Sequence, residues 1–276
     1  MSATEAAPRG AVRYDAPVVR RLAVTWQHPE TRQISPVALL EFDGKRYRFN
    51  YIRNAESVEG FRSLLGFPDL HRTYESPHLF PLFAQRVMDT RRPDHDRYVQ
   101  RLGLQADATP WEQMTRSGGG REGDTLQMFP EPELLSNGKM TCSFLIHGVR
   151  HVPSRPLILG GVERSVTRGE LEERLLSLRK GDRLRLIREP GNPVNPSAVI
   201  TATEDNFPLG WVPDLFLDDL HAMTALNPEA VDVVVEQVNG PDAPPHLRLL
   251  ARLTVTPEPT YRPFTGPSWD PLSRRG

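Results

Sequence analysis

The feature that most constrains this chain is a proline-rich loop between two β-like runs. Residues 188–199 read Arg-Glu-Pro-Gly-Asn-Pro-Val-Asn-Pro-Ser-Ala-Val, and they follow a run of alternating arginine and aliphatic residues. Each of the three prolines fixes φ and removes a backbone donor, so neither strand can continue through the loop. The sequence therefore predicts a stiff loop that presents Asn192 and Asn195 at fixed places beside a returning strand.

Positive charge is concentrated on the strand before this loop. Residues 179–188 hold five positive charges and one negative charge. On a strand, Arg183 and Arg185 face one side, whereas the intervening leucines face the other. The arginine side, with Arg188 at its end, could follow phosphates as a single-strand groove does, or it could be an ordinary solvated face.

An aromatic residue near a strand end is the second element of this prediction. Trp211 follows Gly210 and could stack on a base or sugar, or it could pack in the core. Acidic residues, Glu204 and Asp214 among them, make another side of the same region negative. The net charge of the chain is only −1, so any binding of a polyanion would depend on a local stripe.

The order of residues in this loop, followed by Leu209-Gly210-Trp211-Val212-Pro213, resembles the HIRAN domain over about residues 140–256. The resemblance implies a small OB-like β-barrel that binds single-stranded DNA, especially its 3′ end, in a family associated with DNA remodelling and repair. The six residues expected to form the site are Arg183, Arg185 and Arg188 for phosphates, Asn192 and Asn195 for hydroxyls or base edges, and Trp211 for stacking.

This sequence departs from the family at three places that matter for DNA ends. Phe144-Leu145 stand where end-binding members have an Arg-Tyr pair, Val194-Asn195 replace a Tyr-Asp, and Asp214 aligns with an expected lysine. Valine cannot stack as tyrosine does, and asparagine only partly replaces aspartate. Looser contact with nucleic acid, or a different ligand, therefore stays open.

A second signature lies in the N-terminal region, over about residues 22–104. It consists of Phe49-x-Tyr51, Leu65-Gly66-Phe67-Pro68-Asp69, Tyr74-x-Ser76 and Leu79-Phe80-Pro81. This pattern resembles the N-terminal subdomain of HipA-type toxins, a non-catalytic piece that packs on a kinase core. The resemblance implies an alternative function, a protein-interaction adaptor that docks on a HipA-like kinase or a defence or repair partner through residues 20–130.

The elements predict an α+β fold of two β-rich modules, the second an OB-like barrel with flanking helices. We expect residues 1–19 to form a flexible tail, 20–130 the first module, 131–139 a linker and 140–256 the second module. The Pro-rich tail, residues 257–276, should be mobile or draped on the surface.

Local signals predict several element boundaries within the two modules. Asp43-Gly44 predicts a hairpin, and Thr109 and Thr167, each followed three residues later by glutamate, predict capping boxes. Gly181 is the expected C-terminal cap of the second capped helix. A strand kinked at Gly148 is expected over residues 140–152.

The sequence points away from catalysis and from membranes. No phosphate loop with the G-x-x-x-x-G-K-[ST] spacing and no kinase catalytic loop is present, and Cys142 lies in an apolar run typical of an inert thiol. We expect no cofactor, and zinc enters only through association with larger members of the family. No apolar run approaches the about 20 residues of a membrane span and no signal peptide is visible, so a cytoplasmic location is expected.

Overall fold

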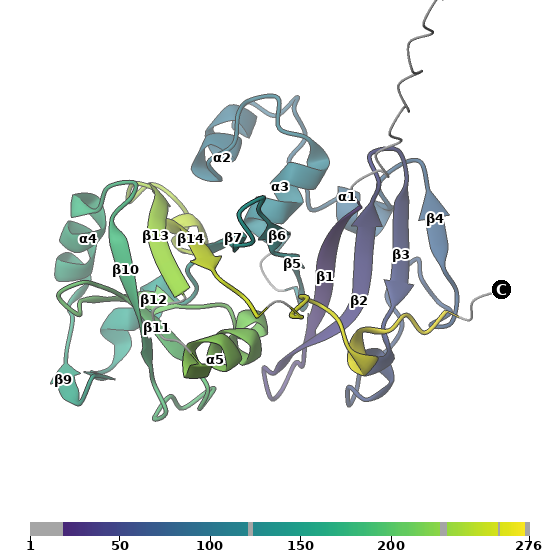
Figure 1. Ribbon diagram of the computed structural model, residues 1–276. Helices are drawn as coiled ribbons and strands as arrows, with labels where there is room; N and C mark the ends of the chain where they lie inside the picture. Colours follow the sequence, from purple (N-terminus) through teal and green to yellow (C-terminus); the bar gives the residue numbers. More distant parts are fainter. Residues whose placement is uncertain (1–18, 121–123, 227–230, 259, 274–276) are drawn as a thin grey trace, which may run out of the picture.

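Two β-rich modules lie side by side in the computed structural model, which describes residues 19–120, 124–226, 231–258 and 260–273 (Figure 1). The fold mixes α and β elements, with the strands arranged in a five-stranded, a seven-stranded and a two-stranded sheet. Helices are short, and none in the described part of the chain is long and apolar enough to cross a membrane.

The first module is an antiparallel sheet in the order β4-β3-β2-β1-β5. Its strands are β1 (Arg20–Gln27), β2 (Ile34–Phe42), β3 (Tyr47–Tyr51), β4 (Tyr74–Ser76) and β5 (Leu126–Pro130). The predicted hairpin forms between β2 and β3, where the Asp43 carboxylate accepts from the backbone of Lys45 and Arg46 and Gly44 has a φ of +90°. One face buries an aromatic core that includes Phe49, Phe67 and Phe83.

Three short helical segments contribute side chains to that core: η1 (Arg53–Glu56), α1 (Pro81–Ala84) and α3 (Pro110–Ser117). The helix α2 (His95–Arg101) instead packs Tyr98 on a leucine cluster that reaches the second module. The capping box predicted at Thr109 is present, because its hydroxyl accepts from the Glu112 backbone N–H while the Glu112 carboxylate accepts from the Thr109 N–H. Trp111 and Met114 point into the core from the helix that this box begins.

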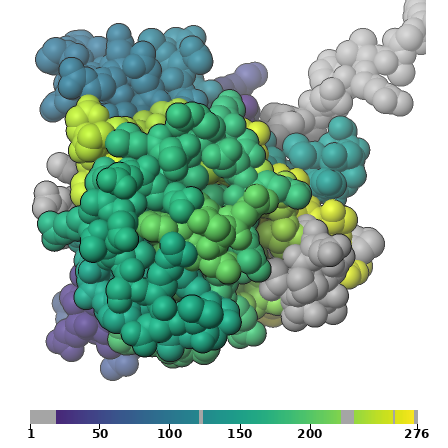
Figure 2. Space-filling model, turned by 90° about the vertical axis from the view of Figure 1, so that its left-hand side faces the viewer, coloured from purple at the N-terminus to yellow at the C-terminus, as the bar shows by residue number. Residues whose placement is uncertain are grey.

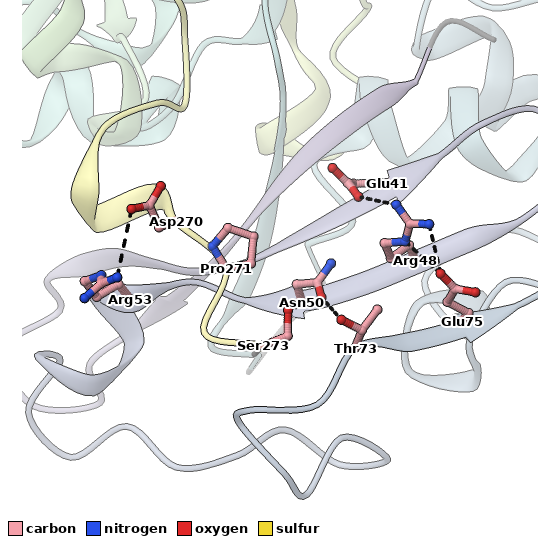
Figure 3. A pocket seen from close by; sticks show the side chains of 9 residues that line it. All are labelled: Glu41, Arg48, Asn50, Arg53, Thr73, Glu75, Asp270, Pro271 and Ser273. Atoms are coloured by element: carbon pink, nitrogen blue, oxygen red, sulfur yellow. Dashed lines mark hydrogen bonds and ion pairs between the residues drawn. The ribbon is translucent and has the colours of Figure 1, made fainter. Parts of the chain in front are cut away.

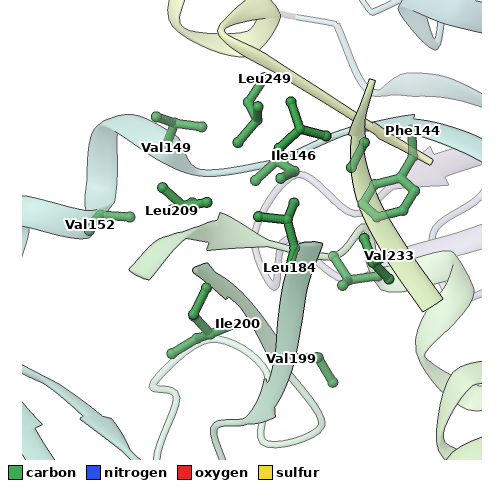
Figure 4. Packing of buried hydrophobic residues seen from close by; sticks show 14 of the residues in the cluster. Phe144, Ile146, Val149, Val152, Leu184, Val199, Ile200, Leu209, Val233 and Leu249 are labelled. Carbon is green, nitrogen blue, oxygen red and sulfur yellow. The ribbon is translucent and has the colours of Figure 1, made fainter. Parts of the chain in front are cut away.

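The second module is an antiparallel sheet in the order β12-β11-β10-β13-β14-β7-β6. Its strands are β6 (Glu133–Leu134), β7 (Met140–Leu145), β10 (Arg183–Arg188), β11 (Val199–Thr203), β12 (Pro208–Trp211), β13 (Val231–Val238) and β14 (Leu249–Val255). A small hairpin, β8 (Leu157–Leu159) with β9 (Val162–Arg164), stands beside it. Aliphatic side chains from opposite strands meet in the core, as Leu184, Ile200, Leu209 and Val233 do in Figure 4.

Two helical segments complete this module, and here two local predictions were wrong. The helix α4 (Arg168–Ser177) begins at the capping box predicted at Thr167, but its C-cap is Leu178, and Gly181 lies in the turn before β10. The strand expected over residues 140–152 stops at Leu145, because Gly148 has a φ of +66° and starts the 3-10 helix η2 (Val149–Ser154). The remaining helices are η3 (Asp214–Phe216), α5 (Leu217–Leu226) and η5 (Pro245–Leu247).

The seven-stranded sheet does not form a closed barrel among the described residues. One isolated antiparallel bridge nevertheless joins the segment after β7 to the edge strand β12. His147 and Trp211 exchange two backbone hydrogen bonds of 2.9 Å each. The bridge brings the two sides of the sheet together at the end where the proline-rich loop lies.

The two modules share an extensive interface. Leu102, after α2, packs with Leu145, Leu247 and Leu250 of the second module. In Figure 2 the blue segment that contains α2 lies against the lime-coloured segment near residue 240, where Arg101 bonds to Asp242. Residues 131–139, expected to be a linker, include β6, which pairs with β7.

The C-terminal segment returns to the first module, as the yellow trace in Figure 1 shows. Phe264 stacks on Trp269 of η6 (Pro267–Trp269), with ring centroids 4.6 Å apart, and Phe264 packs on Ala23 and Ile52. The Leu272 N–H then donates to the Tyr51 carbonyl at 2.9 Å. Described residues 260–273 are therefore draped over the free face of the first sheet.

Candidate nucleic-acid interface

A buried carboxylate organises the corner where the proline-rich loop meets β12. Glu189 is only 3% exposed, and its Oε2 accepts from Trp211 Nε1 and from Asn192 Nδ2, each at 2.7 Å. Its Oε1 accepts from Arg155, which arrives from the end of η2. Sequence reasoning missed Glu189. The only available signal was the position of Glu189 between the strand and the first proline.

The two asparagines shape the loop from within. Asn192 Oδ1 accepts from the backbone N–H groups of Val194 and Asn195, at 2.9 and 3.1 Å. Asn195 donates to Asp214 at 3.0 Å, and its own oxygen accepts from the Ser197 N–H. The amides that were expected to meet a ligand therefore have intramolecular partners, and the loop presents Val194, whose exposed fraction is 75%.

Asp214 is a half-buried member of this network. Burial raises the pKa of its carboxyl, and the hydrogen bond from Asn195 opposes that shift only in part. Asp214 stands where the resemblance led us to expect a lysine, and it reaches back to the loop. It therefore adds to the rigidity of the corner and contributes negative charge there.

Trp211 is held in one orientation and keeps part of its surface exposed. Beyond its bond to Glu189, its ring packs against Gly148, where an added Cβ would lie 2.7 Å from the ring. Gly210 has a φ of +148°, and a Cβ there would come within 2.5 Å of the His147 carbonyl oxygen. The Leu-Gly-Trp pattern thus serves the close approach between β12 and the segment after β7.

The three predicted arginines are exposed, but they do not form one row. Arg183 pairs with Asp232 at 3.1 Å and Arg185 donates to Asn206 at 2.8 Å, both from the outer side of β10. Arg188 is four residues after Leu184 on the same strand, so its side chain lies on the face of Leu184 and opposite to Arg183 and Arg185. Its guanidinium makes no hydrogen bond or ion pair with any residue that the structure describes.

A further group of guanidiniums surrounds the turn between β11 and β12. Arg164 and Arg174 lie over the Phe207 ring, 4.8 and 4.9 Å from its centroid. Arg174 also pairs with Asp205 at 2.8 Å, and Arg185 bonds to the adjacent Asn206. The sequence showed these arginines only as scattered charges, because nothing local relates α4 and β9 to this turn.

Burial shifts the pKa of two titratable side chains in the second module. Burial raises the pKa of the Cys142 thiol to about 12, so this thiol is inert at neutral pH. Burial also lowers the pKa of His147 to about 4, which keeps its imidazole neutral. No group of three or more histidine, cysteine, aspartate or glutamate side chains within the described ranges is arranged to hold a metal ion.

No protein-family model, curated protein or solved structure matches this chain.

Proposed function

We propose that this protein binds single-stranded DNA or DNA ends through its second module, without catalysis. The observation that carries the proposal is the indole of Trp211, partly exposed and fixed by the buried Glu189. Arg155 shares the same carboxylate, and Arg188, which is exposed and has no side-chain partner among the described residues, directly precedes Glu189. A pre-oriented aromatic face beside guanidiniums is the combination that sequence-tolerant single-strand binding uses.

In this proposal Trp211 stacks on a base, while Arg188, Arg183 and Arg185 contact phosphates on either side of β10. The asparagines act by holding the loop. The His147–Trp211 bridge supports an OB-like arrangement, because it joins opposite sides of the sheet next to the binding corner. With the Arg-Tyr and Tyr-Asp positions replaced, we expect a weak preference for 3′ ends.

The test is a fluorescence anisotropy titration of labelled oligothymidylate with the full chain at several salt concentrations. Replacing Arg183 and Arg185 together by glutamate should weaken binding at least about tenfold at low salt. It should also reduce the salt slope by about 1.4, since a single-strand phosphate contact contributes about 0.7. Tailed and blunt duplexes measured in parallel report the preference for ends.

The matched control is Arg91→Glu with Arg92→Glu, which changes the charge equally on an exposed segment of the first module. It should leave affinity and salt slope unchanged. Equal losses in both double variants would show that the net charge, rather than the β10 surface, governs binding. If the wild-type chain binds no DNA while a protein partner survives nuclease treatment in a pull-down, the adaptor alternative replaces this proposal.

A further inference from the structure

A ladder of alternating charges crosses the open face of the first sheet. Its members, one from each strand region, are Glu131, Arg21, Glu41, Arg48 and Glu75. Arg21 Nε donates to Glu131 at 2.7 Å and Arg48 Nε donates to Glu75 at 2.9 Å. Glu41 has the weakest pairing, since its nearest guanidinium nitrogen, on Arg48, is 3.8 Å away.

An open cavity of about 770 Å³ lies between this ladder and the C-terminal segment (Figure 3). Glu41, Arg48 and Glu75 line one side, and Pro271 and Ser273 line the other. The residues that line the cavity belong to the first sheet and to the tail that crosses it, and none of them belongs to the proline-rich corner. It is therefore a separate site from the one proposed for DNA.

Asn50 presents an unused donor to this cavity. The residue is only 6% exposed, and its Oδ1 accepts from the Thr73 hydroxyl at 2.7 Å and from the Ser273 hydroxyl at 3.3 Å. Its Nδ2 has no hydrogen-bond partner among the described residues, and it points away from both hydroxyls into the hollow (Figure 3). Because Nδ2 opens onto the cavity and donates to no described residue, an acceptor on a ligand in the cavity can take a hydrogen bond from it.

Glu41 presents an unused acceptor to the same space. No described residue donates a hydrogen bond to its carboxylate, and burial raises the pKa of this group more than Arg48 lowers it. Because Glu41 pairs in register with Arg48, it is the diagonal neighbour of Asn50 on the adjacent strand. Such neighbours have Cα atoms roughly 7–8 Å apart.

The charges around the cavity favour a cationic ligand. Three carboxylates, those of Glu41, Glu75 and Asp270, face two guanidiniums, those of Arg48 and Arg53, which leaves one excess negative charge. The ligand must donate to Glu41 and accept from Asn50. A ligand whose donor and acceptor lie close together can span these diagonal neighbours, because each of its two hydrogen bonds adds about 2.9 Å.

We propose that this cavity binds an α-ammonium group together with the carbonyl oxygen next to it, with the ammonium on Glu41 and the carbonyl on Asn50. An amino acid amide and the N-terminus of a polypeptide both carry this unit, with a net charge of +1. Capture of an N-terminal amine is an established mode of peptide recognition. The open shape leaves room for the rest of a chain to leave the site.

Isothermal titration calorimetry of the full chain tests the proposal with glycinamide, triglycine amide and N-acetyl-triglycine amide. A buffer near pH 6.5 keeps the amines charged, since an α-amino group has a pKa of about 7.7–8.0. We expect the two free amines to bind and the acetylated peptide to bind at least tenfold more weakly. Tighter binding of triglycine amide than of glycinamide assigns the site to a polypeptide terminus, and equal binding assigns it to the small amide.

Two variants place the binding at this cavity. Glu41→Gln preserves shape and removes the charge, so it should weaken binding of triglycine amide at least tenfold. Glu56→Gln makes the same change on a carboxylate of the same module that does not line the cavity, and it should bind as the wild type does. Thermal melts verify that both variants fold. Failure of both free amines to bind, or equal binding of the acetylated peptide by the wild-type chain, would overturn the proposal whatever the variants do.

Discussion

The indole Nε1 of Trp211 donates to the buried carboxylate of Glu189 across 2.7 Å, and this bond joins the end of β12 to the start of the proline-rich loop. The same oxygen receives the Asn192 amide. One side chain thus fixes the aromatic ring, the loop and, through its other oxygen, Arg155. The rigidity of the corner depends on a residue whose type suggested no role in the core.

Replacing Glu189 by alanine should destabilise the protein by about 2–4 kcal/mol, because it leaves an indole N–H, an amide and a guanidinium without their acceptor. Arg155 is about one-third exposed, so water moderates its share of the loss. Urea unfolding measures the effect. Glu204→Ala, at an exposed position, is the control and should cost less than about 0.5 kcal/mol. Equal costs would contradict the role assigned to Glu189.

Gly210→Ala should cost more than about 2 kcal/mol, because the new Cβ would meet the His147 carbonyl at 2.5 Å and an Ile146 methyl at 2.6 Å. The backbone cannot yield there without breaking the bridge to Trp211. Gly191→Ala, in the nearby loop, meets nothing within 4 Å and should be almost neutral. Chemical unfolding of both variants decides the matter, and a neutral Gly210→Ala would show that the two segments can separate freely.

Stability should fall as the pH drops from about 6.5 to 4, through His147. Its pKa is about 4 in the folded protein and about 6.5 in the unfolded chain, so the unfolded state binds more protons within that window. The free energy of unfolding therefore rises with pH there. We expect the contribution of His147 to the free energy of unfolding to be about 1–3 kcal/mol lower at pH 5 than at pH 7.

His147→Gln isolates this contribution, because the raised pKa values of Glu41 and Asp214 act in the opposite direction in the wild type and in the variant alike. Urea unfolding at pH 7, 6 and 5 gives the difference between the two proteins. The free energy of unfolding of the variant should rise relative to that of the wild type as the pH falls. A difference independent of pH would place the imidazole in contact with water.

The modules should be energetically coupled through Glu236, a buried carboxylate of β13. Arg116 of the first module and Arg252 of β14 each donate to its Oε1 at 2.9 Å, and Ser143 donates to its Oε2. Burial alone would raise its pKa, but these bonds outweigh burial and the pKa is lowered. We expect the carboxylate to be charged at neutral pH and to bind Arg116 strongly.

A double-mutant cycle of Arg116→Met and Glu236→Gln measures that coupling. Unfolding in urea should give an interaction energy of about 1–3 kcal/mol between the two sites. The same cycle with Arg97→Met, an exposed arginine on α2, should give a value near zero. If both cycles gave zero, the Arg116–Glu236 pair would not couple the modules, and the interface would depend on its other contacts, such as the Leu102 cluster and Arg101 with Asp242.

Local signals in the sequence determined the elements that depend on neighbouring residues. The two capping boxes need only a threonine and a glutamate three positions later, and the hairpin at Asp43-Gly44 needs only a short side-chain acceptor and a residue tolerant of positive φ. The stiffness of the loop after Arg188 follows from proline alone. These features were predictable because each is decided within four or five residues of chain.

Tertiary structure decided which groups were left free to act. Asn192 and Asn195 were expected to face a ligand, but whether an amide is free depends on Glu189, on Asp214 and on nearby backbone N–H groups. The pairing of β3 with β2 and with β4 places Asn50 and Glu41 beside one cavity. The tail that forms its other side is brought there from as far as 223 residues away in the sequence. Sequence thus set the local geometry, whereas long-range packing decided which polar groups kept hydrogen-bonding capacity. The physical reason is that a polar group is satisfied or left without a partner only by the groups that the fold places next to it.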